Sequence, residues 1–133
     1  MFDFELFRFV LQGLRQITDG LSKTLAIGEF VHRDFIEGAY VAAPGNVRAW
    51  ILGANSNFGS YAFKVAEITP NTRIDRIADG VAFNHLPMGS YHPGVTHFLL
   101  CDGAVMRVPD GFGIEVYQAM ATANGEEVTV AYE

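Results

Sequence analysis

The chain has 133 residues, a usual length for one domain, and we expect a single globular domain over residues 1–133. Half of the residues are hydrophobic, with eleven Phe and fourteen Gly, which excludes a disordered chain and favours a β-rich fold with many turns. Nine basic residues stand singly against fifteen acidic ones, for a net charge of −6, which argues against nucleic acid or an anionic membrane as partner. No apolar run is long enough to span a bilayer, so we expect no membrane insertion by this chain.

The opening segment, residues 1–14, is rich in phenylalanine. Residues 2–6 alternate apolar and charged side chains, which predicts a strand. Two interpretations of its aromatic side chains stay open. They complete the core of this domain, or they contact another subunit. The candidate contact residues are Phe2, Phe4, Phe7 and Phe9.

Further along the chain, short helix and strand signals alternate with turns. Asp19 and Ser22 are expected to cap a helical turn over residues 21–25, and a strand follows over residues 25–31. Apolar runs predict two further strands, at residues 47–52 around Trp50 and at residues 61–68, separated by a polar loop. Residues 70–89 lack periodicity and predict an irregular excursion.

The C-terminal half contains the strongest local signal, Asp102-Gly103 between two apolar runs. It predicts a β-hairpin over residues 97–108 with a two-residue turn, in which Leu100 faces Val105. Apolar residues at helical spacing predict a helix at about residues 112–123, and a closing strand follows over residues 127–132. The predicted fold is therefore α+β, a mainly antiparallel sheet with the hairpin at its centre and the C-terminal helix packed on it.

Three segments together resemble a known family: ITDGLSKTLAIGE, SYHPGVTHFLLCDGAVMRV and GIEVYQAMATANGEEV. In this order they resemble the planctomycete-type pilin-like proteins with a DUF1559 domain, whose pattern includes a His-x9-Asp-Gly element. The residues that match the motifs are Ile17, Thr18, Asp19, Gly20, Ser22, Thr24, Trp50, Ser90, His92, Pro93, Gly94, Asp102, Gly103, Gly125, Glu126 and Val128.

The resemblance implies a pilin-like fold and a structural role without enzymatic activity. Such a subunit would be pseudopilin-like, would self-assemble or associate with a secretion system, and would lie outside the cell or at its surface. Its partners would be copies of itself or related pilin-like subunits. Lys23, Val95 and Glu127 depart from the usual family pattern. The long hydrophobic N-terminal helix of pilins has no counterpart here, so we expect the globular part of such a subunit.

Histidines near the hairpin suggest a competing hypothesis, a metal-dependent hydrolase built on His85, His92 and His97. Asp102 lies at the hairpin tip, roughly 15 Å from His97 along the strand, and spacing alone does not make these side chains converge. We therefore expect no shared metal site. His92 is instead expected to fix the loop that enters the hairpin.

Calcium is the more plausible ion, because loops rich in carboxylates and carbonyls suit it. The candidate ligands are Asp75, Asp79, Asn84 and Asp110, although turn formation is the favoured role of these residues. No other cofactor is expected. A third hypothesis is a small-ligand or glycan-binding module that uses the Trp50 strand and the loop at residues 55–61. Cys101, in an apolar strand without a nearby base, predicts an inert thiol.

Overall fold

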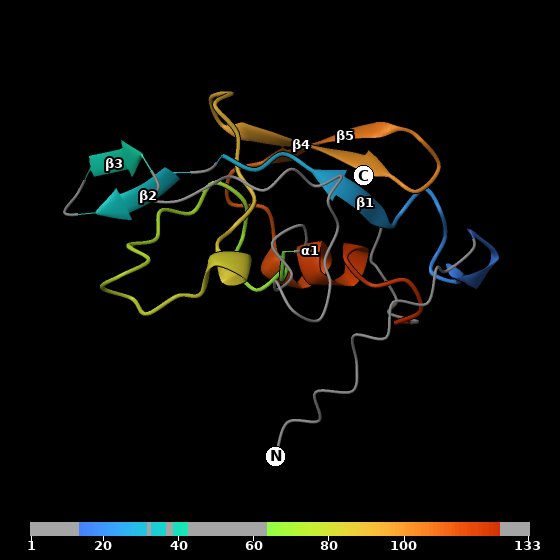
Figure 1. Ribbon diagram of the computed structural model, residues 1–133. Helices are drawn as coiled ribbons and strands as arrows, with labels where there is room; N and C mark the ends of the chain where they lie inside the picture. Colours follow the sequence, from blue (N-terminus) through green and yellow to red (C-terminus); the bar gives the residue numbers. More distant parts are fainter. Residues whose placement is uncertain (1–13, 32, 37–38, 43–63, 126–133) are drawn as a thin grey trace, which may run out of the picture.

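The computed structural model describes residues 14–31, 33–36, 39–42 and 64–125 (Figure 1). Within them lie a three-stranded antiparallel sheet in the order β1-β4-β5, a separate β2-β3 hairpin, one α-helix and two 3-10 helices. Their bounds are η2 Leu14–Gln16, β1 Leu25–Gly28, β2 Arg33–Ile36, β3 Ala39–Ala42, η4 Phe83–His85, β4 Val95–Leu100, β5 Val105–Pro109 and α1 Ile114–Met120. The predicted segments at residues 2–6, 47–52, 55–61 and 127–132 lie outside the described residues.

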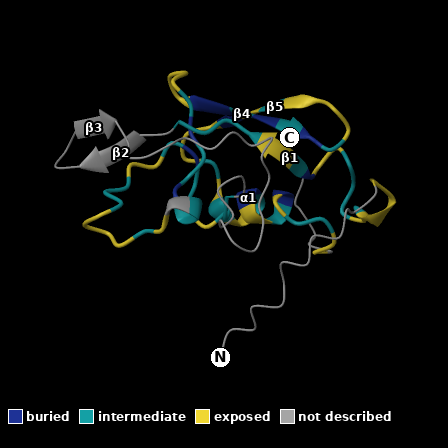
Figure 2. Ribbon diagram, in the orientation of Figure 1, coloured by how far each residue is buried: buried dark blue, intermediate teal, exposed yellow. Residues whose placement is uncertain are grey.

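Helix α1 covers one face of the three-stranded sheet and forms the core with it (Figures 1 and 2). Phe98 of β4, Val108 of β5 and Tyr117 of α1 are buried together. The rings of Phe98 and Tyr117 meet edge to face, with centroids 5.8 Å apart, a favoured aromatic geometry. A helix packed on an antiparallel sheet confirms the α+β prediction.

The hairpin exists where the sequence predicts it, but its predicted register is wrong by one residue. Leu99, not Leu100, pairs with Val105. The loop holds three residues, because the Leu100 N–H donates to the Ala104 carbonyl and the Gly103 N–H donates to the Leu100 carbonyl. Gly103 has φ +90°, so the turn is a three-residue loop closed by a glycine bulge. The slip moves one strand's side chains to the opposite face relative to the predicted pairs.

Strand β1 is shorter than predicted. Its last residue is a glycine because the side chains of Met88 and Phe98 lie close to its backbone. A Cβ atom on Gly28 would overlap the side chains of Met88 and Phe98, so only glycine fits where β1 crosses the core. The predicted helical turn over residues 21–25 is a hydrogen-bonded turn instead, in which the Lys23 N–H donates to the Gly20 carbonyl. Helix α1 is also shorter than the predicted range of residues 112–123.

Two valines of β5 provide a matched test of the core. Val108 is fully buried, whereas Val105 is 67% exposed. We expect Val108→Ala to lower the free energy of unfolding by about 2–3 kcal/mol, because it removes buried methyl groups and leaves a cavity. Val105→Ala should stay within about 0.5 kcal/mol of the wild type. Urea unfolding followed by circular dichroism measures both, and equal losses would contradict the core described here.

Burial raises the pKa of Tyr117 to about 12, against about 10 in an unfolded chain. Below pH ~10 the phenol is neutral in both states, and its contribution is fully present. Between pH ~10 and ~12 the unfolded chain ionises first, so we expect stability to fall by up to about 2–3 kcal/mol. Tyr117→Phe should remove this part of the alkaline decline, and the exposed Tyr91→Phe should not. Unfolding free energies measured across this pH range would show it.

Candidate functional site

The sheet face opposite α1 carries two rows of side chains that run across the strands. In the first, Ile27, Leu99 and Val105 lie side by side on β1, β4 and β5. Ile27 is 52% exposed and Val105 is 67% exposed. This outer face therefore presents an apolar row next to a polar one.

The polar row brings together a carboxylate and two imidazoles. Oε2 of Glu29 lies 3.1 Å from Nδ1 of His97, and Oε1 of Glu29 lies 3.7 Å from Nε2 of His92. The two rings stand nearly perpendicular with centroids 5.0 Å apart. One potential ligand atom from each residue lies within 4.8 Å of the other two. We call these three residues the Glu-His-His cluster.

Backbone hydrogen bonds hold the cluster in place. The Glu29 N–H donates to the His97 carbonyl at 3.1 Å, and the His97 N–H donates to Oε2 of Glu29 at 2.7 Å. The Gly89 N–H donates to the Glu29 carbonyl, and this bond holds the loop before β4 next to Glu29. In that loop the His92 N–H donates to the Ser90 hydroxyl, which closes a local turn. Two of the three side chains are thus fixed by strand pairing and the third by the loop.

Electrostatics keep the carboxyl of Glu29 ionised. Partial burial raises its pKa, but hydrogen bonds from the backbone and ring of His97 and from Ser90 lower the pKa by more. The result is a pKa below the ordinary glutamate value. A carboxylate that stays charged and faces two imidazoles is an acceptor for protons or for a cation.

The sequence prediction for these histidines is partly wrong. The structure brings His92 and His97 together, although we expected no convergence, and Glu29 completes the cluster. Nδ1 of His85 lies 2.8 Å from Oε2 of Glu67 instead. In the part of the chain that the structure describes, the group with metal-ligand spacing includes neither His85 nor Asp102. Sequence reasoning missed Glu29 because only the pairing of β1 with β4 brings it to His97.

The ITDG motif, residues 17–20, binds the residues that follow α1, so the first and the last described parts of the chain lie together. Oδ2 of Asp19 accepts hydrogen bonds from the Thr122 hydroxyl at 3.0 Å and from the Gly125 N–H at 2.8 Å. The Thr18 N–H donates to the Ala123 carbonyl. The prediction that Asp19 caps a helical turn with Ser22 is wrong, because the carboxylate binds the segment after α1.

The residues that follow Asp19 in the sequence, Leu21 and Thr24, also bind the tip of the β4-β5 hairpin. The Cys101 N–H donates to the Thr24 carbonyl, and the Asp102 N–H donates to the Leu21 carbonyl. The Asp102 carboxylate accepts from the Ala104 N–H within the turn, as Asp does in Asx turns. The buried Thr24 in turn donates its hydroxyl hydrogen to the Gly20 carbonyl. The segment that begins with Ile17 and the segment that contains the hairpin are therefore joined by hydrogen bonds, and several of their motif residues take part in them.

The four calcium candidates make hydrogen bonds to other protein groups. The Asp79 N–H donates to the Asp75 carbonyl, and the Asp75 N–H donates to Oδ2 of Asp79. Oδ1 of Asp110 accepts from the Asn71 side chain at 2.7 Å. Asn84 lies in η4, where its carbonyl accepts from the Val65 N–H. The contacts between Asp75 and Asp79 match the turn-forming role, whereas Asn84 and Asp110 bond to residues distant in the chain. Calcium binding by the four residues stays a prediction.

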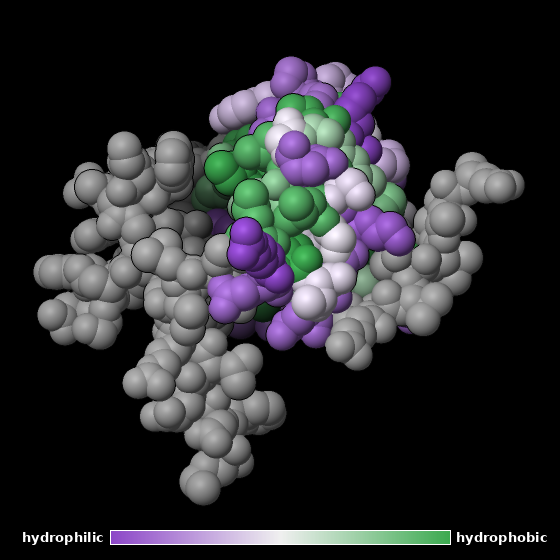
Figure 3. All heavy atoms as spheres, turned by 90° about the vertical axis from the view of Figure 1, so that its right-hand side faces the viewer, coloured by the Kyte–Doolittle hydropathy of each residue, from purple (hydrophilic) through white to green (hydrophobic). Residues whose placement is uncertain are grey.

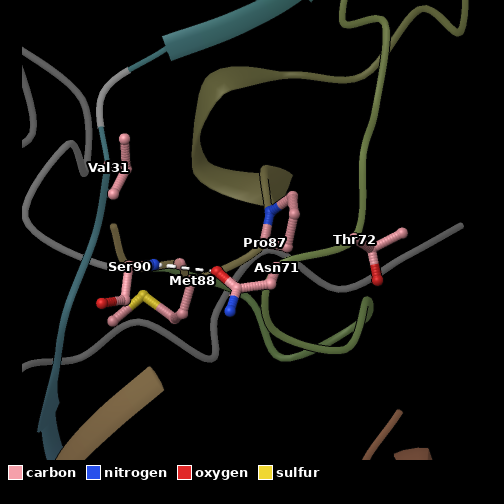
Figure 4. A pocket seen from close by; sticks show the side chains of 7 residues that line it. Val31, Asn71, Thr72, Pro87, Met88 and Ser90 are labelled. Carbon is pink, nitrogen blue, oxygen red and sulfur yellow. Dashed lines mark hydrogen bonds between the residues drawn. The ribbon is translucent and has the colours of Figure 1, made fainter. Parts of the chain in front are cut away.

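A small hollow lies beside the loop that leads to the cluster (Figure 4). Its volume is about 50 Å³, which is room for ordered water and too little for a metabolite. Oδ1 of Asn71 accepts from the Ser90 N–H across it, and the Asn71 N–H donates to the Met88 carbonyl. The residues that line it are Val31, Asn71, Thr72, Pro87, Met88, Gly89 and Ser90. We interpret this hollow as part of the loop's scaffold.

Two further reactive side chains have shifted pKa values. Burial, and then the neighbouring Asp102, raise the pKa of the Cys101 thiol, which matches the expected inert thiol. Burial lowers the pKa of Lys64 to about 7, and its ammonium group lies 3.6 Å from the centre of the Phe30 ring. No local pattern predicts the burial of this lysine, because its burial depends on the tertiary fold.

Comparison with known proteins places the chain in a family. Residues 9–112 match the family described as "Protein of unknown function (DUF1559)". The chain belongs to this family. The match covers the ITDG segment and the His-x9-Asp-Gly hairpin of this DUF1559 protein and stops before α1. No curated protein and no solved structure matches it.

Asp19 and Ser22 distinguish the two roles considered for the ITDG motif. We expect Asp19→Ala to lower the free energy of unfolding by about 1.5–3 kcal/mol, because two hydrogen bonds to a charged group are lost. Ser22→Ala should change it by less than about 0.5 kcal/mol. Thermal and urea unfolding measure both. A larger loss for Ser22→Ala than for Asp19→Ala would restore the helix-capping role.

Proposed function

We propose that this DUF1559 protein is a structural, pilin-like subunit that self-assembles, or assembles with related subunits, at the cell surface or outside the cell. Membership of the family and the α+β fold with its central hairpin support this role. Enzymatic activity is not part of the proposal. Among the described residues, the helices fall short of the length and apolar character needed to cross a bilayer.

The observation that carries the proposal is the apolar row of Ile27, Leu99 and Val105, in which Ile27 and Val105 are exposed and Leu99 is half-buried. It crosses all three strands on the face that α1 does not cover. Apolar side chains that line up on a sheet and stay exposed favour a contact surface over chance exposure. Figure 3 views the hairpin-tip end of the molecule, where apolar side chains are bordered by polar ones, and the outer face of the sheet points upward in this view. The surface suits packing against a second subunit.

The two competing hypotheses stand differently. The glycan-binding hypothesis stays a prediction, because Trp50 and the loop at residues 55–61 lie outside the described residues. The hydrolase hypothesis needs His85 beside His92 and His97, and His85 pairs with Glu67 instead. The Phe-rich segment, residues 1–14, stays a candidate subunit contact of this proposal.

Self-association can be tested on the outer face with a matched pair of variants. Val105 and Ile77 are equally exposed, at 67% and 66%, but only Val105 lies on the sheet. We expect the sedimentation coefficient of the wild type to rise with concentration, and Val105→Glu to suppress this rise because it places a charge in the contact.

Ile77→Glu is the control and should associate like the wild type. Thermal unfolding should confirm that both variants are folded. A wild-type chain that stays strictly monomeric at the highest soluble concentration would contradict the proposal. Equal behaviour of the two variants would place the contact elsewhere on the surface.

A further inference from the structure

The Glu-His-His cluster has the composition of a transition-metal site. Two imidazole nitrogens and one carboxylate oxygen form a common protein ligand set for Zn²⁺, with a further position left to solvent. The three residues come from two separate parts of the chain, the end of β1 and the loop and strand at residues 92–97. Their approach is therefore a product of the fold and not of neighbouring sequence positions.

The spacing fits a metal. Tetrahedral Zn²⁺ with bonds of about 2.0–2.1 Å holds its ligand atoms about 3.3–3.5 Å apart. Nδ1 of His97 lies 3.1 Å from Oε2 of Glu29, and Nε2 of His92 lies 3.7 Å from Oε1. The two distances lie on either side of this value and involve the two oxygens of one carboxylate. All three ligand atoms lie within 4.8 Å of one another, so a shift of up to about 1.5 Å of the exposed His92 ring would bring them to this spacing.

The surroundings hold two ligands and leave the third adjustable. Glu29 and His97 are joined by one backbone hydrogen bond beside β1 and β4 and by a second one from the His97 N–H to Oε2 of Glu29, which fixes their relative position in advance. The His92 side chain is 60% exposed, so an ion can reach the cluster from solvent. Arg107 lies directly across the ladder from His97, and its positive charge is expected to limit the affinity.

We propose that Glu29, His92 and His97 form a binding site for a divalent transition metal, with Zn²⁺ the best fit. The metal would join the loop before β4 to the residue that follows β1. His92 of the His-x9-Asp-Gly element would then be a metal ligand. The inference concerns one subunit and does not rest on the proposed assembly.

The test is a titration of the metal-free full-length chain with Zn²⁺, by calorimetry and by competition with a chromophoric chelator. We expect one Zn²⁺ per chain and a rise in the unfolding temperature when Zn²⁺ is added. His92→Ala should weaken binding at least about tenfold. Since His92 is exposed, this variant should fold, and circular dichroism checks it.

His85→Ala is the matched control, because His85 also faces a glutamate but has no second imidazole beside it among the described residues. It should bind Zn²⁺ like the wild type. Glu29→Gln tests the carboxylate and should also weaken binding. The proposal is overturned if the wild type binds no stoichiometric Zn²⁺, if His92→Ala binds as tightly as the wild type, or if His85→Ala loses as much affinity as His92→Ala. Sedimentation of the Zn²⁺-bound chain at low concentration separates a site within one subunit from an ion that bridges two subunits, and bridging alone would also overturn it.

Discussion

Strand β4 is the element on which the rest of the described structure depends, because it is hydrogen-bonded along both edges. Its alternation divides the protein into two faces. Phe98 points to α1 and meets Tyr117, whereas His97 and Leu99 point to the outer face. The fold and the candidate surfaces are thus two consequences of one strand. Packing of Phe98 on the inner side sets which side chains of β4, His97 and Leu99 among them, face the outer side.

Much of the fold follows from local sequence signals. The parts that local signals fail to predict are those that depend on tertiary contacts. The Asp102-Gly103 turn and the helical spacing around Tyr117 predict the hairpin and α1, since turn chemistry and apolar periodicity act over a few residues. The register slipped by one because a two-residue and a three-residue loop both use glycine. The sequence does not predict the β2-β3 hairpin, because Arg33 and Asp34 leave no apolar run before Glu37-Gly38.

The candidate site was harder to predict for the same reason. His92 and His97 are five residues apart, and a straight strand would separate them. The turn at Ser90 and the positive φ of Gly94 fold the loop back instead. Glu29 is distant in sequence and enters only through the β1-β4 pairing. Asp19 carried a correct signal for a hydrogen-bond acceptor, but its partners lie more than a hundred positions away, so local capping rules assigned it to the wrong helix end.

The contacts between the ITDG segment and the residues after α1 have a mechanical consequence. Asp19 binds Gly125, and Thr18 binds Ala123, close to the first and the last of the described residues. A pulling force applied at residues 14 and 125 would load these few bonds first, while the sheet and the core between them bear no tension. These hydrogen bonds carry the force directly from one end of the described chain to the other. In a subunit held in a stretched filament, their rupture would precede any separation of β4 from its neighbours.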